Sequence, residues 1–330
     1  MSVKTVRRSL AALLVAGSAF GAMPPLQAAD ALRIGYQKYG SLVLLKAKGT
    51  LEQRLAEQDI EVRWTEFPGG PQLLEGLNVG SVDFGLTGET PPVFAQAARA
   101  ELRYVAFDAP APRSEAILVP HDSPIRSVIE LKGKKVALNK GSNVHYLLVR
   151  ALEEVGLSIR DITPVYLPPA DGRAAFESRR VDAWVIWDPF QAAAEEQLNA
   201  RTLRDGEGLV DNHQFYLASQ TFADKHPQVI RVLVEELRKV GAEAEANPQR
   251  AADVIGPLIG LPPSIAIKAL GRQSYDTRYL TPEVVAAQQR IADTFTELKL
   301  IPKRLTIKDV VWTPPAAAVA SAAEQGGIRP

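Results

Sequence analysis

Residues 181–190 read VDAWVIWDPF, and residues 82–91 read VDFGLTGETP. Both stretches open with Val-Asp, carry an acidic residue seven positions after the Val, and have a Pro close behind that acid. Each is preceded by a segment of periodic apolar residues, at 71–81 in the first half and at 171–180 in the second. A shared dipeptide alone would mean little, but the shared offsets of the acid and the Pro indicate two similar units in one chain.

Each unit also begins in the same way, with a strand pattern that runs into a Gly-containing turn and then a helix pattern. Arg33 lies 49 residues before Val82, and Lys135 lies 46 residues before Val181. Each half therefore has the pattern strand, helix, strand, helix, strand, which is typical of a parallel sheet with crossover helices. The sequence predicts an α/β protein of two lobes, each a mainly parallel sheet flanked by helices.

Two crossings between the lobes account for the rest of the chain. A Pro-rich segment separates strand-like runs at 104–107 and 116–119, which suits a chain that leaves the first lobe for the second. The apolar run at 215–219 is the predicted return, and four helical patterns follow it, most of them opened by Pro. The predicted division is lobe one at 30–113 and 215–313, lobe two at 114–214, and hinges near Pro112 to Ala116 and His213 to Leu217.

The two ends of the chain differ from the lobes in composition. The N-terminus has a basic stretch that ends at Arg7-Arg8, an apolar run from Leu10, and small residues at 28–29, which is the layout of a secretory signal peptide. The Arg7-Arg8 pair leaves the twin-arginine export route open beside the general one. We expect a signal peptide at 1–29, a periplasmic location, and a disordered low-complexity tail at 314–330.

Composition argues against several classes of function. The 330 residues hold 38 basic and 38 acidic side chains, so no global positive field attracts nucleic acid or an acidic membrane surface. The chain has no cysteine, which excludes disulfides, thiolate metal sites, cysteine nucleophiles and a lipidated cysteine anchor. It also lacks the G-x-S-x-G, G-x-x-x-x-G-K-[ST] and H-E-x-x-H motifs. We therefore expect a binding protein without a metal or cofactor, rather than an enzyme.

The candidate site lies where the predicted strands end. In open α/β sheets, ligands bind beyond the carboxyl ends of the strands, where helix N-termini present unpaired N–H groups. Four such ends can be named, at 35–38, 87–90, 140–143 and 187–188. If the two lobes face each other with these ends inward, amide donors and short polar side chains line the cleft. Such a lining favours a small anion.

Several of these polar residues could have a structural role as well as a role in ligand binding. Ser142 and Asn143 are also good helix N-caps, and a capping side chain leaves other N–H groups free for a ligand. Glu89 and Asp188 would repel an anion, so capping or hydrogen-bonding support is the favoured role for both. His145 could bond a ligand directly or support a residue that does, and it has no partner at metal-ligand spacing.

Trp184 and Trp187 account for two of the chain's 4 tryptophans. Their odd separation puts them on opposite faces of a strand. Trp184 falls in the body of the strand, which favours core packing, whereas Trp187 ends the strand and could form a rigid wall of the cleft or pack in the core. Lys38, Arg99 and Arg113 could supply a cation, although each is by default a solvated surface residue.

Five blocks together resemble a known family: IGYQK at 34–38, FPGGPQLLEGLNVGSVDFGLTGETPPVFAQA at 67–97, KGSNVH at 140–145, PADGRAAF at 169–176 and VDAWVIWDPF at 181–190. The chain is similar to the aliphatic-sulfonate-binding proteins of bacterial ABC importers, which are related to the taurine- and nitrate-binding proteins. The likeness runs from about Leu32 to about Trp312. It implies a type II periplasmic-binding-protein fold, in which a ligand closes between two lobes.

The resemblance implies a function and a site. The function is to capture alkanesulfonates in the periplasm and deliver them to an ABC permease for sulfur acquisition, as a monomer. Main-chain and hydroxyl donors would bind the sulfonate oxygens, and Trp187 would bound the apolar tail. The family's cleft pattern falls on Gln37, Thr87, Gly88, Glu89, Ser142, Asn143, His145, Trp187 and Asp188.

Alternatives remain open at this point. The family often has Asp where this chain has Glu89, and the added methylene leaves the selectivity for tail or amine undecided. Taurine, nitrate or a sulfate ester are rival ligands. An enzyme that resembles thiamine-pyrimidine synthases is a rival class, but those proteins carry a Cys-rich motif and this chain has no Cys. A sensory domain would normally be joined to a membrane helix or an output domain.

Overall fold

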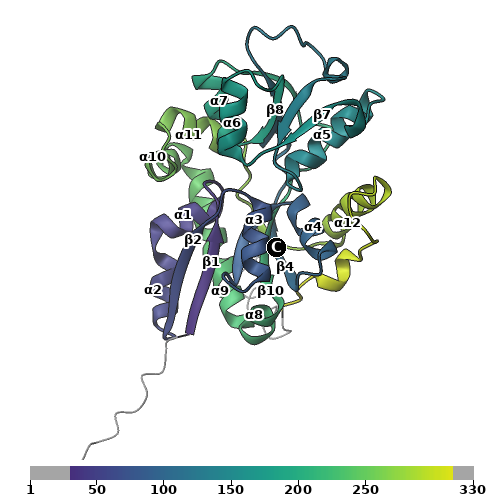
Figure 1. Ribbon diagram of the computed structural model, residues 1–330. Helices are drawn as coiled ribbons and strands as arrows, with labels where there is room; N and C mark the ends of the chain where they lie inside the picture. Colours follow the sequence, from purple (N-terminus) through teal and green to yellow (C-terminus); the bar gives the residue numbers. More distant parts are fainter. Residues whose placement is uncertain (1–29, 315–330) are drawn as a thin grey trace, which may run out of the picture.

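The computed structural model describes residues 30–314, whose strands form two sheets with helices around them (Figure 1). The predicted signal peptide at 1–29 lies outside the described residues, as does the predicted tail apart from residue 314. In Figure 1 one sheet lies in the lower half of the molecule and the other in the upper half. The predicted α/β fold with two sheets flanked by helices is confirmed.

The first sheet has six strands in the order β11-β4-β10-β3-β1-β2. β1 runs parallel to β2 and β3, whereas β10 runs antiparallel to both β3 and β4. β11 is also antiparallel to β4, so the sheet is mixed where a mainly parallel one was expected, because the chain returns into it at β10 from the other half. The bounds are β1 Asp30–Tyr36, β2 Ile60–Glu66, β3 Phe84–Gly88, β4 Leu102–Asp108, β10 Gln214–Ser219 and β11 Thr277–Tyr279.

The second sheet has five strands in the order β7-β6-β8-β5-β9. β6 runs parallel to β7 and β8, and β5 runs antiparallel to β8 and β9. In each sheet the strand that enters from the other half, β5 or β10, therefore runs against its neighbours. The bounds are β5 Glu115–Val119, β6 Lys135–Leu138, β7 Thr163–Tyr166, β8 Ala183–Trp187 and β9 Arg201–Asp205.

Helices cover both sheets and follow the predicted order. The two repeated units are β1-α1-α2-β2-α3-β3 and β6-α5-β7-α6-β8; the first crossover is split at Gly49, whose φ of 69° ends α1. The α-helices are α1 Ser41–Lys48, α2 Thr50–Ala56, α3 Gly70–Asn78, α4 Thr90–Ala97, α5 Asn143–Glu154, α6 Pro169–Glu177, α7 Phe190–Gln197, α8 Gln220–Lys225, α9 Pro227–Ala246, α10 Pro248–Ile259, α11 Pro263–Leu270 and α12 Pro282–Glu297. Short 3₁₀ turns occur at Pro112–Ser114, Val128–Leu131, Ile159–Asp161 and Ile307–Val310.

Two chain segments cross between the sheets and lie side by side. The backbone N–H of Ala111 donates to the carbonyl of Asp211 at 3.0 Å, and that of Gly206 donates to the carbonyl of Pro112 at 3.0 Å. The side chain of Asn212 adds bonds to the carbonyl of Ala111 at 3.0 Å and to Ser114 Oγ at 2.9 Å. We propose that each sheet with its helices forms one lobe, joined to the other lobe through this pair of crossing segments.

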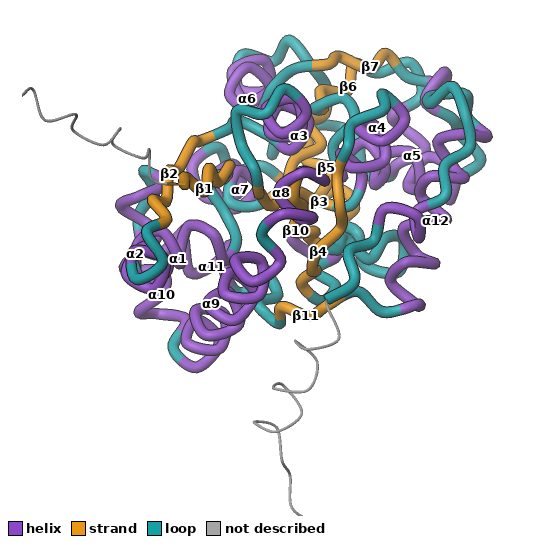
Figure 2. Tube along the Cα trace, turned by 90° about the horizontal axis from the view of Figure 1, so that it is seen from below, coloured by secondary structure: helices purple, strands orange, loops and turns teal. Residues whose placement is uncertain are grey.

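The last helices contact both halves. α10 and α11 pack on each other, α10 also packs on α1 and α9 beside the first sheet, and α11 packs on α7 beside the second. On the other flank, Phe295 of α12 lies 4.9 Å from the ring of Phe94 and 5.5 Å from the ring of His145. Both views agree that the two flanks are separate, because α11 and α12 lie on different sides of the strands (Figure 2). The predicted division assigns both helices to lobe one alone.

Trp184 is part of the core, as predicted. Its side chain is 1% exposed, and its ring packs on Phe176 of α6 with 5.9 Å between centroids. Within residues 30–314, no single helix has both the length and the hydropathy needed to cross a membrane. α10 and α11 meet both criteria only when taken together, and this pair is bent by 116°.

Candidate functional site

The carboxyl ends of strands from the two sheets meet face to face. A Cβ atom placed on Gly88, at the end of β3, would lie 2.8 Å from Cγ of Asn143 at the start of α5. A Cβ atom on Gly69, just before α3, would lie 2.7 Å from Nδ2 of Asn139 and 3.8 Å from the ring of Trp187. Only glycine allows these approaches without a shift, because a Cβ contact below 3 Å is a clash. The structure thus brings the predicted ends at 87–90, 140–143 and 187–188 together.

A buried polar cluster lies at the centre of this junction. Glu89 Oε2 accepts a hydrogen bond from the backbone N–H of His213 at 3.0 Å. Asn143 donates through Nδ2 to Glu115 Oε2 and, at 3.2 Å, to Asn212 Oδ1. The cluster therefore connects the start of α4 in the first half and the start of α5 in the second half with residues at the ends of the two crossing segments.

Burial changes the charge of this cluster. It raises the pKa of Glu89 to about 8, against the bond from His213, and it raises the pKa of Glu115 well above its usual range. The charge of Glu89 raises the pKa of Glu115 further. At neutral pH both carboxyls are consequently held toward the protonated form. A protonated Glu89 does not repel an anion. Charge repulsion, which was the reason to expect no direct contact between Glu89 and an anionic ligand, is therefore removed.

Asp188 supports the helix that follows it, as predicted. Its backbone N–H donates to the carbonyl of Ser114 at 2.8 Å, and its Oδ1 accepts from the N–H of Ala192 in the first turn of α7 at 2.9 Å. Its Oδ2 lies 3.4 Å from Nη1 of Arg272. Burial raises the pKa of Asp188 to about 7, although the positive charge of Arg272 opposes the rise. Sequence reasoning did not single out Arg272, which lies 84 positions further along the chain.

Ser142 and His145 are both buried, in a turn and helix that face the first half. Ser142 occupies the N-cap position of α5, but its Oγ donates back to the carbonyl of Asn139 at 2.7 Å instead of accepting from the helix. His145 Nδ1 accepts from the N–H of Gly141 at 3.3 Å, and the ring packs among aromatic side chains that include Phe94, 6.2 Å away. Burial lowers the pKa of His145 to about 4, so its ring is neutral.

Gln37 and Thr87 bond within the first half. Gln37 Nε2 donates to the carbonyl of Leu86 at 3.0 Å and lies 3.4 Å from the hydroxyl of Tyr39. Thr87 Oγ1 donates to the carbonyl of Gly88 at 3.0 Å. Both side chains are buried, and their protein partners already satisfy these donors. Their own bonds thus hold the strand ends rather than point to a ligand.

Several buried donors have no partner within the described part of the chain, among them Nε2 of His145, and two of these donors lie close together where the halves meet. These two are Nε1 of Trp187 and Nδ2 of Asn139, both on residues that lie against Gly69. A buried N–H group without an acceptor is unfavourable, which makes such a pair a candidate for contact with a ligand. Asn139 and Gly69 were not predicted from the sequence. Gly69 lies inside a quoted block, in PGGP before a helix, and Asn139 directly precedes the block KGSNVH.

The three cations named from the sequence are dispersed: Lys38 lines a small cavity with Asp188, Arg113 is exposed in the turn Pro112–Ser114 of the first crossing segment, and Arg99 lies in the first half. Lys38 pairs with Glu66 at 3.6 Å, with both side chains exposed. Arg99 lines a cavity of about 650 Å³ at the amino end of β1, together with Arg33, Phe222 and His226. That cavity contains none of the predicted site residues, so its size does not make it the site. No group of His, Asp or Glu that could hold a metal ion occurs among residues 30–314.

Comparisons with known proteins agree on one family. A family model described as NMT1/THI5 like matches residues 55–251. A relative from Escherichia coli strain K12, named as an aliphatic sulfonates-binding protein, is 45% identical over 288 residues, which are 86% of this chain and 89% of the relative.

Solved structures give the same result. The alkanesulfonate-binding protein SsuA from Xanthomonas axonopodis pv. citri, bound to MOPS, matches with a TM-score of 0.82 and 44% identity, over 86% of this chain and 98% of that one. The periplasmic aliphatic sulphonate binding protein SsuA from Escherichia coli matches with a TM-score of 0.78 and 44% identity, over 87% of this chain and 93% of that one.

Proposed function

The chain belongs to the NMT1/THI5-like family, among its aliphatic sulfonate-binding members, and on that premise we propose that it captures alkanesulfonates and delivers them to an ABC permease. The resemblance read from the sequence blocks is thereby confirmed. The proposal includes a periplasmic location after removal of residues 1–29, a monomeric state, and a supply of sulfur as the purpose of uptake. The named relatives are binding proteins, which supports a non-enzymatic function.

The observation that supports the ligand class most directly is the pair of buried, unpartnered donors. A sulfonate group has three acceptor oxygens, and Trp187 Nε1 and Asn139 Nδ2 lack acceptors where the two halves meet. Gly69 lets both residues approach the N-terminus of α3, whose first N–H groups are also free for an acceptor. An oxyanion held by neutral donors suits a site in which nearby carboxyls are held toward the protonated form.

The mechanism that we propose is a hinge closure. A ligand between the lobes would stabilise their contact and shift the equilibrium from an open to a closed arrangement, which the permease would recognise. The crossing segments near Ala111 and Asn212 would absorb the change. The nine residues that the sequence names remain our proposed site, with Gln37 and Thr87 holding its strand ends, and with Asn139 and Gly69 added to them.

A thermal-shift series on residues 30–330 tests the function. A ligand that binds only the folded protein raises the melting temperature as its concentration rises. We expect ethanesulfonate and longer alkanesulfonates to raise it more than taurine, nitrate or sulfate at equal concentration. Isothermal titration calorimetry with the best sulfonate then gives the Kd and a stoichiometry of one. A shift with nitrate or sulfate and none with any sulfonate would contradict the proposal.

A further inference from the structure

α11 forms a separate contact with the second half of the molecule. Ala192 and Ala193 of α7 pack on Ile265 and Ala269 of α11, in an apolar cluster that is not continuous with the main core. These are mostly small side chains, so the apolar area that they bury is limited. The contact needs a further interaction to fix its geometry.

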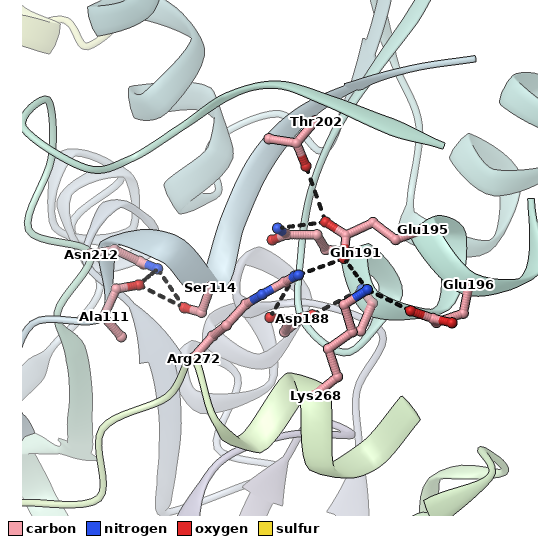
Figure 3. Close-up of polar contacts among 11 residues, drawn as sticks. Ala111, Ser114, Asp188, Gln191, Glu195, Glu196, Thr202, Asn212, Lys268 and Arg272 are labelled. Carbon is pink, nitrogen blue, oxygen red and sulfur yellow. Dashed lines mark hydrogen bonds and ion pairs between the residues drawn. The ribbon is translucent and has the colours of Figure 1, made fainter. Parts of the chain in front are cut away.

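Two cations on the α11 side supply that interaction (Figure 3). Arg272 Nη2 bonds Glu195 Oε2 at 2.5 Å, and Lys268 Nζ lies 3.1 Å from the same oxygen and 2.5 Å from Glu196 Oε1. The other oxygen of Glu195 accepts from Thr202 at 3.0 Å. Burial raises the pKa of Glu195, but the bonds and charges of Arg272 outweigh it and the net pKa is lowered. The carboxylate is therefore charged and held on both of its oxygens.

Arg272 also reaches the proposed ligand site. Its Nη1 lies 3.4 Å from Asp188 Oδ2, and Asp188 directly follows Trp187 at the end of β8. The backbone of Asp188 bonds Ser114 in the first crossing segment, whose Oγ accepts from Asn212 in the second (Figure 3). One guanidinium thus connects α11 with the ligand-facing end of β8 and, through Asp188, with the hinge.

The chain around Arg272 is anchored in the first half. Five residues later β11 begins and pairs with β4, and Tyr275 is buried against Gly241 of α9. Asp188 and Glu195, in contrast, follow or belong to elements of the second half. The bonds of Arg272 therefore span the two halves at a place where the chain itself does not cross.

We infer that Arg272 is a positioning residue for ligand binding, a non-covalent strap that joins α11 to Asp188 and Glu195 and stabilises the closed arrangement of the lobes. This inference rests on the proposed function. Arg272 is 18% exposed and its partners are 0% and 13% exposed, so solvent screens these pairs less than pairs on the surface. Removal of the guanidinium also leaves the carboxylate of Asp188 buried without its cation, which disfavours the closed form.

The test compares Arg272→Gln with a matched control, Arg204→Gln. Arg204 is 25% exposed and pairs with Glu154 and Asp205, all within the second half. Since the chain has no cysteine, dyes attached at Glu57→Cys and Ile129→Cys report the distance between lobes by energy transfer. The readouts are this transfer without ligand and the Kd for an alkanesulfonate.

We expect Arg272→Gln to lower the transfer without ligand and to raise the Kd roughly tenfold, while Arg204→Gln changes neither. Glu195→Gln should act in the same direction, and Arg272→Lys should recover part of the affinity because it keeps the charge. These two variants decide the matter if Arg272→Gln fails to fold. Equal transfer and equal Kd in Arg272→Gln and Arg204→Gln, with only a lower melting temperature, would overturn the inference. If the wild type binds no sulfonate, the proposed function fails, whereas the transfer without ligand still decides the strap.

Discussion

Trp184 and Trp187 lie on one strand but have different surroundings. Trp184 packs on α6 within the second half, and Trp187 packs edge-on against Phe190, 6.2 Å away, and lies next to Gly69 of the first half. Trp184 is therefore a residue of the core, and Trp187 is a residue of the junction between the halves. Their substitutions should affect different properties.

Trp184→Ala should reduce the free energy of unfolding by about 3–5 kcal/mol, because it removes a large side chain from a packed core. Trp187→Phe keeps an aromatic ring but removes the unpartnered Nε1–H, so we expect an unchanged fold and a Kd for alkanesulfonate raised about five- to tenfold. Urea unfolding and calorimetric titration measure the two effects. A Trp187→Phe variant that binds as tightly as the wild type would remove Nε1 from the proposed site.

The buried carboxyls predict an unusual dependence of stability on pH. Burial raises the pKa of Glu89 to about 8 and that of Asp108 and Asp188 to about 7. In the unfolded chain such groups titrate near 4. Between about pH 4 and pH 8 these carboxyls thus bind more protons in the folded protein than in the unfolded chain, so their contribution to stability falls as the pH rises; the lowered pKa of His145 opposes this only below about pH 6.5.

We predict that the melting temperature of residues 30–330 is lower at about pH 8.5 than at about pH 5.5, by several degrees. Glu89→Gln should make this fall smaller, because an amide does not ionise. The exposed Glu75→Gln on α3 is the control and should leave the fall unchanged. Scanning calorimetry at the two pH values measures all three proteins. An identical fall in wild type and Glu89→Gln would show that Glu89 does not titrate in this range.

For single residues, the sequence could indicate where polar side chains gather but not which hydrogen-bond partner each one has. Ser142 lies at the predicted start of a helix, yet its hydroxyl bonds Asn139 rather than the helix. Arg272 could not be found, because its partner Asp188 lies 84 positions away and no local pattern records that distance. Asn139 and Gly69 could have been suspected from their places at a strand end and a helix start.

Among the elements, β3 shows how two glycines of one strand serve different contacts. A Cβ atom on Gly85 would lie 2.6 Å from Leu73 and 3.0 Å from the carbonyl of Gly35, all within the first half. A Cβ atom on Gly88 would instead meet Asn143 of the second half, at 2.8 Å from Cγ and 2.9 Å from Cβ. The strand therefore packs within the first half at Gly85 and against the second half at Gly88.

We predict that Gly85→Ala lowers the free energy of unfolding by about 1–3 kcal/mol, through overpacking against Leu73. Gly88→Ala should leave the stability of the ligand-free protein nearly unchanged and raise the Kd at least tenfold, because the added methyl group keeps the halves apart. Urea unfolding and calorimetric titration again separate the two. If Gly88→Ala bound ligand normally, the contact between Gly88 and Asn143 could not be required for closure.

Most elements follow from local patterns. The Pro-opened helices α9, α10, α11 and α12 begin at or next to the prolines that predicted them, and both repeated units have the predicted order. Local patterns do not show which strand or helix each element packs against. The insertion of β10 between β3 and β4, and the packing of α11 on α7, depend on residues far apart in the chain, so neither could be predicted from the sequence.

For the molecule as a whole, two covalent crossings join the halves, together with non-covalent contacts at α11, at α12 and at the junction around Gly69 and Gly88. The crossings share hydrogen bonds at Ala111 and Asn212 and lie beside the buried cluster of Glu89, Glu115 and Asn143. A rotation of one half on the other would change the bonds of this cluster, because they connect each half with the crossing segments. The hinge and the proposed site are thus one connected set of bonds, which explains how a small ligand could control the whole shape.

The overall charge then bears on how fast a ligand arrives. The first 29 residues hold three basic side chains and no acidic one, so residues 30–330 carry 35 basic and 38 acidic residues, a formal charge of −3. Such a molecule has no positive field to draw in an anion, unlike proteins whose charged clefts steer their ligands. We predict that the association rate constant for an alkanesulfonate does not fall as the ionic strength rises from about 0.01 M to about 0.1 M, a range over which the Debye length shrinks from about 30 Å to about 10 Å. Stopped-flow fluorescence of Trp187, with Trp187→Phe as the control for the signal, measures this rate. A several-fold decrease over the same range would mean that local cations such as Lys38 guide the anion to the cleft.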